Sequence, residues 1–389
     1  MPSISAYVKP ELLKWARTSA NIQPIAAARK IGVPEDLIAA WEAGQKRPTI
    51  TQLRKATTVY RRPLAVFYLP EPPEGYETLR NFRRLGPSQS GGWSTALHGE
   101  YRRAHFQRDV LLELAELDQE RPPSDWRLSQ LRGTDEQLAE SVRRRLMSLV
   151  DLKVPTASSD EYSHLGYWTR ALEDAGVLVM STQGGLVSVE EMRAFSLYFD
   201  EVPVIMLNGA DAPRGRLFSL LHEYMHLLLH TEGLCDMTTD QYAVTEDRRL
   251  EARCNALAAE ILMPRESVLG SVLVRQHHPG DPWILGDLIE AARPFGVSVE
   301  ALLRRLVTLQ QVSLADYQAF REAQQGSAAV KKRPSGGSFY FTKARDLGKG
   351  YVRTVAGAHR RSLIDSTTAA EYLDAKVGQI ARLAEVSGS

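Results

Sequence analysis

The sequence predicts an α+β fold that is mostly helical, with one small β-sheet. Helical periodicity dominates residues 92–150 and 216–325, whereas the short apolar runs typical of strands gather between residues 176 and 208. Pro- and Gly-rich stretches at 71–92 and 326–338 interrupt these patterns and have the composition of linkers. With 389 residues, the chain is long enough for two or three domains with ample cores.

The same observations divide the chain into four parts. We expect a helical bundle in residues 1–70, a linker with a helical connector in 71–159, an α+β domain in 160–325, and a basic linker with a small module in 326–389. We find no internal repeat in the sequence.

Three short segments are the strand candidates of the central domain. Pro203 lies in the last of them and indicates either a strand start or an edge strand, because proline cannot donate a ladder hydrogen bond. The segments are VLVMS (177–181), AFSLYF (194–199) and VPVIMLN (202–208).

Composition excludes several classes of protein. Hydrophobic residues make up 43% and charged residues 24% of the chain, which is ordinary for a globular protein and argues against extensive disorder. No run approaches the ~20 apolar residues of a membrane span, and the first residues lack the apolar core of a signal peptide. The two cysteines, Cys235 and Cys254, are too few for a disulfide framework and fit a reducing compartment. We therefore expect a cytoplasmic protein that does not interact with membranes.

Charge is distributed unevenly along the chain, although the net charge is only +1. Residues 1–62 hold eleven Lys and Arg against four acids, and residues 327–361 hold nine against one, while the segment between them is acidic. Basic ends around an acidic centre indicate nucleic-acid contact at the ends, with solvated surface charge as the plain alternative.

The segment LFSLLHEYMHLLLH (217–230) contains the pattern His222-Glu223-Tyr224-Met225-His226. Its unbroken apolar character, without Gly or Pro, predicts a buried helix, on which residues i and i+4 share one face. His222 and His226 can therefore bind one metal ion, and Glu223 can take a proton from the attacking water. The alternative is a pair of core histidines hydrogen-bonded to the backbone. A metal explains better why two His and a Glu lie in an apolar helix, because burying such groups unsatisfied is costly.

A zinc site of this kind needs a third protein ligand, and the next helical segment, 246–264, offers several. Glu251 lies at the margin of the apolar stripe of this segment, where an unpaired carboxylate would be costly. Glu260 is its main rival, and Glu246 is expected to face solvent. Cys254 is a soft ligand type, but its place in the stripe favours a core residue.

The groups that would complete such a site are less well defined. His230, one turn after His226, is either a substrate contact or an ordinary helix-end residue. Tyr242 and His277 are candidates for stabilising the oxyanion.

The segments RLFSLLHEYMHLLLH (216–230) and EARCNALAAEILMP (251–264) resemble the ImmA/IrrE family of zinc metallopeptidases. In that family, HExxH is followed by a helix whose first Glu is the third zinc ligand. The resemblance covers roughly residues 160–310 and departs from the family pattern at Cys254 and Leu257, where the family has Ala and Phe.

This resemblance implies a zincin-like metallopeptidase domain with Zn²⁺ as cofactor. His222, His226 and Glu251 would be the metal ligands, and Glu223 the catalytic base. Strand 194–199 is the expected edge on which a substrate peptide adds as an extra strand.

Residues 25–57, IAAARKIGVPEDLIAAWEAGQKRPTITQLRKAT, resemble XRE-type helix-turn-helix domains. Glu35 and Asp36 fall where such a domain faces the major groove, and carboxylates there repel phosphate and accept only from cytosine amino groups. Lys46 and Arg47, which flank the second helix, are the candidate DNA contacts. The alternative is a fold retained for protein–protein contact.

The C-terminal segment 339–382 is similar to the extension found in proteins that fuse these two domains. Together, the resemblances imply a cytoplasmic zinc endopeptidase that cleaves a helix-turn-helix repressor or antitoxin in stress or mobile-element regulation. Double-stranded DNA and a second copy of the chain are the further partners that we expect. The alternative is a transcriptional regulator or antitoxin whose metallopeptidase module is a sensor or scaffold.

Overall fold

A computed structural model describes most of the chain, in nine stretches. They are residues 5–20, 22–60, 62, 64–72, 94–128, 133–230, 243–277, 283–325 and 338–388. The chain divides into two compact units, Met1–His105 and Phe106–Ser389. The described residues are mostly helical and include one three-stranded sheet, which confirms the predicted fold class. The four-part division predicted from the sequence stays a prediction.

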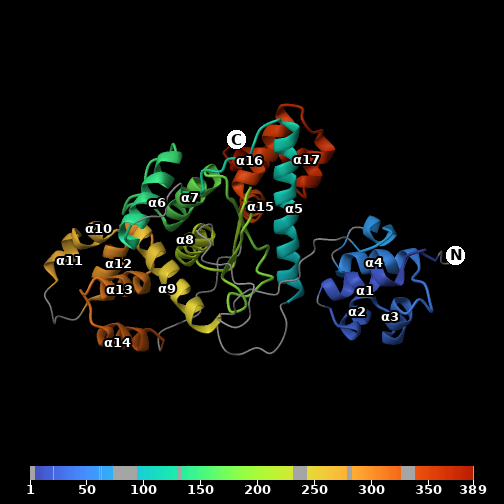
Figure 1. Ribbon diagram of the computed structural model, residues 1–389, viewed down its shortest axis with the longest axis horizontal. Coiled ribbons are helices and arrows are strands. Elements are labelled where there is room, and N and C mark those ends of the chain that lie inside the picture. The colour runs from blue at the N-terminus through green and yellow to red at the C-terminus, as the bar shows by residue number, and fades with distance from the viewer. Residues whose placement is uncertain are drawn as a thin grey trace. The chain divides into compact units, whose positions relative to one another are not determined.

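The first unit is a bundle of short helices (Figure 1). Its elements are α1 (Pro10–Ser19), α2 (Pro24–Ile31), α3 (Glu35–Glu42), α4 (Ile50–Tyr60), the 3-10 helix η1 (Leu64–Tyr68) and the first part of α5 (Thr95–Leu117). Gly32 ends α2 with a φ of +79°, a backbone conformation that glycine adopts without the strain that a Cβ would cause. Ile31, Ile38 and Trp41 are buried where α2 and α3 meet the bundle core.

The second unit contains the sheet and the remaining helices. The sheet order is β1-β3-β2, with β1 parallel and β2 antiparallel to the central strand β3. The strands are β1 (Leu178–Ser181), β2 (Ala194–Leu197) and β3 (Val204–Leu207). Pro203 directly precedes the central strand, and its carbonyl accepts a hydrogen bond from the Leu178 N–H at 2.9 Å. This proline therefore marks a strand start and not an edge.

Helices precede and follow this sheet in the chain. Before it in the chain come α6 (Asp135–Leu149) and α7 (Glu161–Asp174). After it come α8 (Pro213–His230), α9 (Ala243–Leu262), α10 (Arg265–Leu269), α11 (Val272–Gln276), α12 (Leu285–Ala292), η2 (Arg293–Phe295), α13 (Val299–Thr308) and α14 (Leu314–Gln325). Helix α8 packs against β2, β3, α7 and α9, so it lies at the centre of the unit. No helix of the described chain is both long and apolar enough to cross a bilayer.

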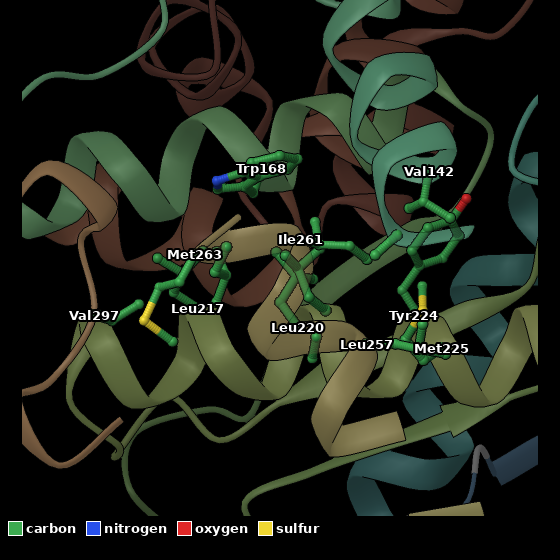
Figure 2. Packing of buried hydrophobic residues seen from close by; sticks show 14 of the residues in the cluster. Val142, Trp168, Leu217, Leu220, Tyr224, Met225, Leu257, Ile261, Met263 and Val297 are labelled. Carbon is green, nitrogen blue, oxygen red and sulfur yellow. The ribbon is translucent and has the colours of Figure 1, made fainter. Parts of the chain in front are cut away.

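The core of the second unit forms where α8 and α9 meet (Figure 2). Leu220, Tyr224 and Met225 of α8 pack against Leu257 and Ile261 of α9, and all five are fully buried. The buried Tyr224 hydroxyl donates a hydrogen bond to the Trp126 carbonyl at 2.7 Å, which satisfies its polar group. Full burial of large apolar side chains on both helices fixes their mutual position.

The C-terminal helices are α15 (Phe339–Leu347), α16 (Lys349–Arg360), α17 (Ser366–Tyr372), the 3-10 helix η3 (Val377–Gln379) and α18 (Ile380–Val386). They attach to the rest of the second unit where α15 and α16 contact β1 and α16 contacts α7. Gly348 joins α15 to α16 with a φ of +90°, and a Cβ there would lie 2.2 Å from the Val179 carbonyl oxygen. The backbone of these helices therefore approaches β1 more closely than a side chain would allow.

Candidate metal centre

Helix α8 brings the two histidines of the HExxH pattern together. Apolar residues on the other faces of α8, among them Leu221 and Tyr224, are buried and hold the helix in place. His222 and His226 are four residues apart and therefore share a face. Their Nε2 atoms are 3.0 Å apart, and both rings are partly buried.

Helix α9 adds a carboxylate to this pair. The Oε2 atom of Glu251 lies 3.4 Å from His222 Nε2, and its Oε1 atom lies 3.3 Å from His226 Nε2. Within the described residues, one group of three potential metal ligands has its ligand atoms within 4.8 Å of one another. It consists of His222, His226 and Glu251. Residues 25 positions apart in sequence thus meet because α9 packs along α8.

The separations of these atoms fit a tetrahedral metal ion. Zinc bonds of about 2.0–2.1 Å to N and O ligands place neighbouring ligand atoms about 3.3–3.4 Å apart. The three observed separations, 3.0, 3.3 and 3.4 Å, are close to this edge length. Two imidazoles and a carboxylate are also the ligand set of catalytic zinc sites that leave the fourth position to water or substrate.

Electrostatics at the cluster favour a positive charge among the three groups. Hydrogen bonds from His222 and His226 hold the pKa of the Glu251 carboxyl well below its ordinary value. Burial alone would lower the pKa of His226, but its hydrogen bonds with Cys254 and Glu251 outweigh burial and raise it to about 10. A site that stabilises an added proton this strongly also suits a cation.

The carboxylate of Glu223 is held by a residue that the sequence analysis missed. The Ser196 hydroxyl of β2 donates a hydrogen bond to Glu223 Oε2 at 2.7 Å. Helix α8 packs directly on β2, and this packing brings the two residues together across 27 positions of sequence. The sequence contains only a weak indication of this role, because Ser196 is a single small polar residue inside the apolar run of strand 194–199.

Cys254 has both a core position and a contact with the cluster. It is fully buried, as its place in the apolar stripe predicts, and its Sγ lies 3.6 Å from His226 Nδ1. Metal-binding histidines usually have such a partner on the ring nitrogen that does not bind the metal. The corresponding Nδ1 atom of His222 is buried and has no hydrogen-bond partner among the described residues.

The rival candidates of the sequence analysis lie elsewhere or outside the described residues. Glu260 forms an ion pair with Arg305 and accepts a hydrogen bond from the Arg265 N–H, so it is directed away from the histidine pair. His277 stacks on Trp283 with ring centroids 3.7 Å apart. Tyr242 and the side chains of His230 and Glu246 lie outside the part that the structure describes.

In the first unit, the residues predicted to approach DNA are exposed. Glu35 and Asp36 are exposed in the first turn of α3. Lys46 and Arg47 follow that helix, both exposed, and the Arg47 guanidinium lies 4.3 Å from the centre of the Tyr7 ring. The helix itself is anchored by Glu42, which accepts two hydrogen bonds from Arg17 at 2.6 and 2.8 Å.

Two family models match parts of the chain, one in each unit. Residues 172–307 match the peptidase M78 family model, described as the IrrE N-terminal-like domain, and residues 13–67 match the model described as helix-turn-helix. No curated protein matches the chain. The chain therefore combines an N-terminal helix-turn-helix domain with an IrrE N-terminal-like peptidase domain, the combination that the sequence predicted. These domain types associate it with DNA binding and metal-dependent peptidase chemistry.

Proposed function

We propose that this protein is a zinc-dependent endopeptidase in which His222, His226 and Glu251 bind the metal and Glu223 is the catalytic base. The observation that carries the proposal is the near-tetrahedral spacing of the ligand atoms of His222, His226 and Glu251. Glu223 lies next to the two histidines on α8. A bound zinc ion would supply Lewis-acid polarisation of the scissile carbonyl and activation of the attacking water.

The chain's own residues would then move the proton. Glu223 takes it from the attacking water at one carboxylate oxygen and delivers it to the leaving amine. Ser196 holds the other oxygen, Oε2, and so orients the carboxylate before the substrate arrives. A module acting only as a scaffold or sensor would need neither Glu223 nor its hydrogen bond with Ser196.

The substrate would bind along β2. Among the described residues this strand pairs with β3 alone, so its other edge can accept an extended peptide as an additional strand. The Ser196 side chain contacts Glu223 from this strand, so a peptide bound along it would pass close to the catalytic base.

For the substrate itself, we propose a partner regulator of the helix-turn-helix type or an antitoxin, cleaved in the cytoplasm during stress or mobile-element regulation. The helix-turn-helix domain supports this choice, because binding the DNA that a repressor occupies would raise the effective concentration of a weak substrate. Alternatively, this domain could pair with the repressor's own domain, or with a second copy of the chain. The expected activity is one cut at an exposed segment of a cognate regulator and little cleavage of unfolded protein.

Metal analysis tests the ligand assignment. We expect one zinc per wild-type chain and substoichiometric zinc in His226→Ala and Glu251→Ala. His277→Ala is the matched control and should retain the metal, because His277 packs on Trp283. Full zinc occupancy in His226→Ala would refute the assignment.

Cleavage assays test the substrate class. The zinc-loaded protein is incubated with purified helix-turn-helix regulators encoded near its own gene, and separately with casein, and the fragments are identified by mass spectrometry. We expect a single cut in a regulator that disappears when the metal is chelated. Broad digestion of casein with the regulators intact would contradict the proposed specificity but not the zinc chemistry.

A further inference from the structure

The C-terminal helices repeat the pattern of the N-terminal helix-turn-helix domain. In the first unit, the pattern consists of the buried residues Ala27, Ala28, Ile31, Ile38 and Trp41. In the C-terminal helices, buried residues recur in the same order and at the same spacing, as Ala369, Ala370, Leu373, Ile380 and Leu383. A helix-turn-helix needs such positions because its two short helices must bury one face against each other and against a third helix.

The turns between the helices also agree. Gly32 follows Ile31 with a φ of +79°, and Asp374 follows Leu373 with a φ of +45°, so both chains turn through the left-handed region. After the turn, the Val33 N–H donates to the Ala28 carbonyl at 3.0 Å, and the Ala375 N–H donates to the Ala370 carbonyl at 2.9 Å. These two hydrogen bonds close the same ring at equivalent positions.

The packing helices correspond as well. Helix α1 contacts α3 in the first unit, and α16 contacts both α17 and α18 in the second. Helix α17 corresponds to α2, and the stretch formed by η3 and α18 (Val377–Val386) corresponds to α3. From these agreements, we propose that α16–α18 form a second helix-turn-helix unit that binds duplex DNA through the exposed face of Val377–Val386.

The exposed face of this second helix differs in chemistry from its counterpart. Val377 and Gly378 occupy the positions of Glu35 and Asp36, and both are exposed. The N-terminal residues of a recognition helix contact base edges in the major groove, where an apolar side chain can contact a thymine methyl group. The first unit presents two carboxylates at these positions, whereas the second presents none.

Basic and small side chains complete the face. Lys376 directly precedes Val377–Val386, and Arg382 lies within it, six residues further along; both are exposed. Arg382 forms an ion pair with Glu385 at 2.5 Å, but such exposed pairs are weak, so the guanidinium can turn to a phosphate or a guanine. Gly378 and Ala381 have little or no side chain and allow the helix backbone to approach the groove. With no carboxylate at its first two positions, this helix suits a DNA groove better than α3, which presents Glu35 and Asp36 there.

The face is available in the folded protein. The helices are anchored to the peptidase domain at the other end of α16, where Glu173 accepts hydrogen bonds from the Gly350 N–H at 2.8 Å and from Arg353 at 2.7 Å. Val377 is 52% exposed. This inference does not depend on the proposed peptidase activity, because zinc and Glu223 have no part in it.

Selection of DNA by the full-length protein tests the proposal. Wild type, K376A/R382A and K46A/R47A each select duplexes from a randomised pool at low salt, and affinities for the enriched sequences are measured by fluorescence anisotropy. We expect a motif that is enriched by wild type and by K46A/R47A but lost in K376A/R382A. The affinity of K376A/R382A for this motif should fall roughly tenfold or more, with a shallower dependence on salt.

Two further variants test whether the effect on DNA binding is specific to this helix. Lys349→Ala removes an exposed base at the end of α16 that packs on β1, and should leave the motif and its affinity unchanged. Val377→Glu introduces a carboxylate at the position that corresponds to Glu35 of α3, and should abolish selection of the motif. All variants are compared with wild type by thermal melting, because exposed substitutions should not change the fold.

Two results would overturn the proposal. One is an identical motif and affinity in wild type and K376A/R382A, and the other is no DNA binding by wild type at low salt. If K376A/R382A changed the oligomeric state in sedimentation while DNA binding stayed the same, the face would be a protein contact instead.

Discussion

At the scale of single residues, the proposed chemistry depends on Glu223. Glu223→Gln should keep the metal, because residue 223 is not a ligand in the proposed site, and the amide is similar in size to the carboxylate. Cleavage of a confirmed substrate should fall by roughly 10²–10⁴-fold, because an amide cannot accept the proton of the attacking water. Zinc analysis beside the cleavage rate checks this prediction. A wild-type rate in Glu223→Gln would show that another group is the base.

Ser196 is the positioning residue for that base. Ser196→Ala removes a hydrogen bond to the Glu223 carboxylate and leaves the charge in place. Hydrogen bonds to charged groups contribute about 1.5–3 kcal/mol, so we expect kcat to fall roughly tenfold to a hundredfold. KM should change little, and Ser196→Thr, which keeps the hydroxyl, should recover part of the rate.

The experiment must distinguish two roles of Ser196: orienting the carboxylate of Glu223 and stabilising strand β2. If Ser196 acts through Glu223, Ser196→Ala should lower kcat in the otherwise wild-type protein but have little further effect when Glu223→Gln is already present. Equal losses in both backgrounds, together with a lowered melting temperature, would indicate a structural role only.

At the scale of elements, the attachment of α15 and α16 to β1 depends on one glycine. Gly348→Ala would place a Cβ 2.2 Å from the Val179 carbonyl oxygen in a backbone with a φ of +90°. Positive-φ strain and the contact with the backbone together should lower the free energy of unfolding by about 2 kcal/mol or more. Chemical denaturation of the full chain measures this loss.

A second glycine in the same region is the matched control. Gly357 lies within α16, and a Cβ there would meet only the Arg360 guanidinium, at 3.9 Å. Gly357→Ala should therefore leave stability unchanged or raise it by about 0.5–1 kcal/mol, because alanine favours a helix more than glycine does. Equal effects of the two substitutions would mean that the close approach at β1 contributes nothing.

At the scale of the whole second unit, a buried ion pair joins the C-terminal helices to the peptidase domain. Glu173 of α7 pairs with Arg353 of α16, and 5% and 17% of the two side chains remain exposed. Burial raises the pKa of the Glu173 carboxyl above its ordinary value of 4.5, and the Arg353 charge only partly opposes this. The ionised carboxylate is therefore less favourable in the folded protein than in the unfolded chain.

This shift predicts a pH dependence. A carboxyl whose pKa is raised in the folded state binds more protons there, so it lowers stability as the pH rises above about 4.5. Glu173→Gln removes the titrating group, and its stability relative to wild type should increase over this range. Denaturation of both proteins at a series of pH values gives the difference directly. A constant difference from pH 4 to 8 would contradict the raised pKa.

The sequence by itself determined the features that depend on local spacing. His222 and His226 share a face because any helix places residues i and i+4 together, and the apolar run around them is enough to predict that helix. The mostly helical fold, the three strands and the helix-turn-helix near Gly32 follow from similarly local patterns. The recurrence of that pattern at α17 and α18 is not predicted by the sequence, which shows no internal repeat, because it consists only of a few buried positions and a turn.

The tertiary structure decided which distant residues meet. Glu251 and Glu260 both lie on α9, and only the packing of α9 against α8 places Glu251 beside the histidines. Glu260 instead forms an ion pair with Arg305 of α13. Ser196 meets Glu223 because α8 crosses β2, and the C-terminal helices attach at Gly348 because β1 lies beneath them. Periodicity shows which face of an element is apolar, but the partner of that face is set by long-range packing.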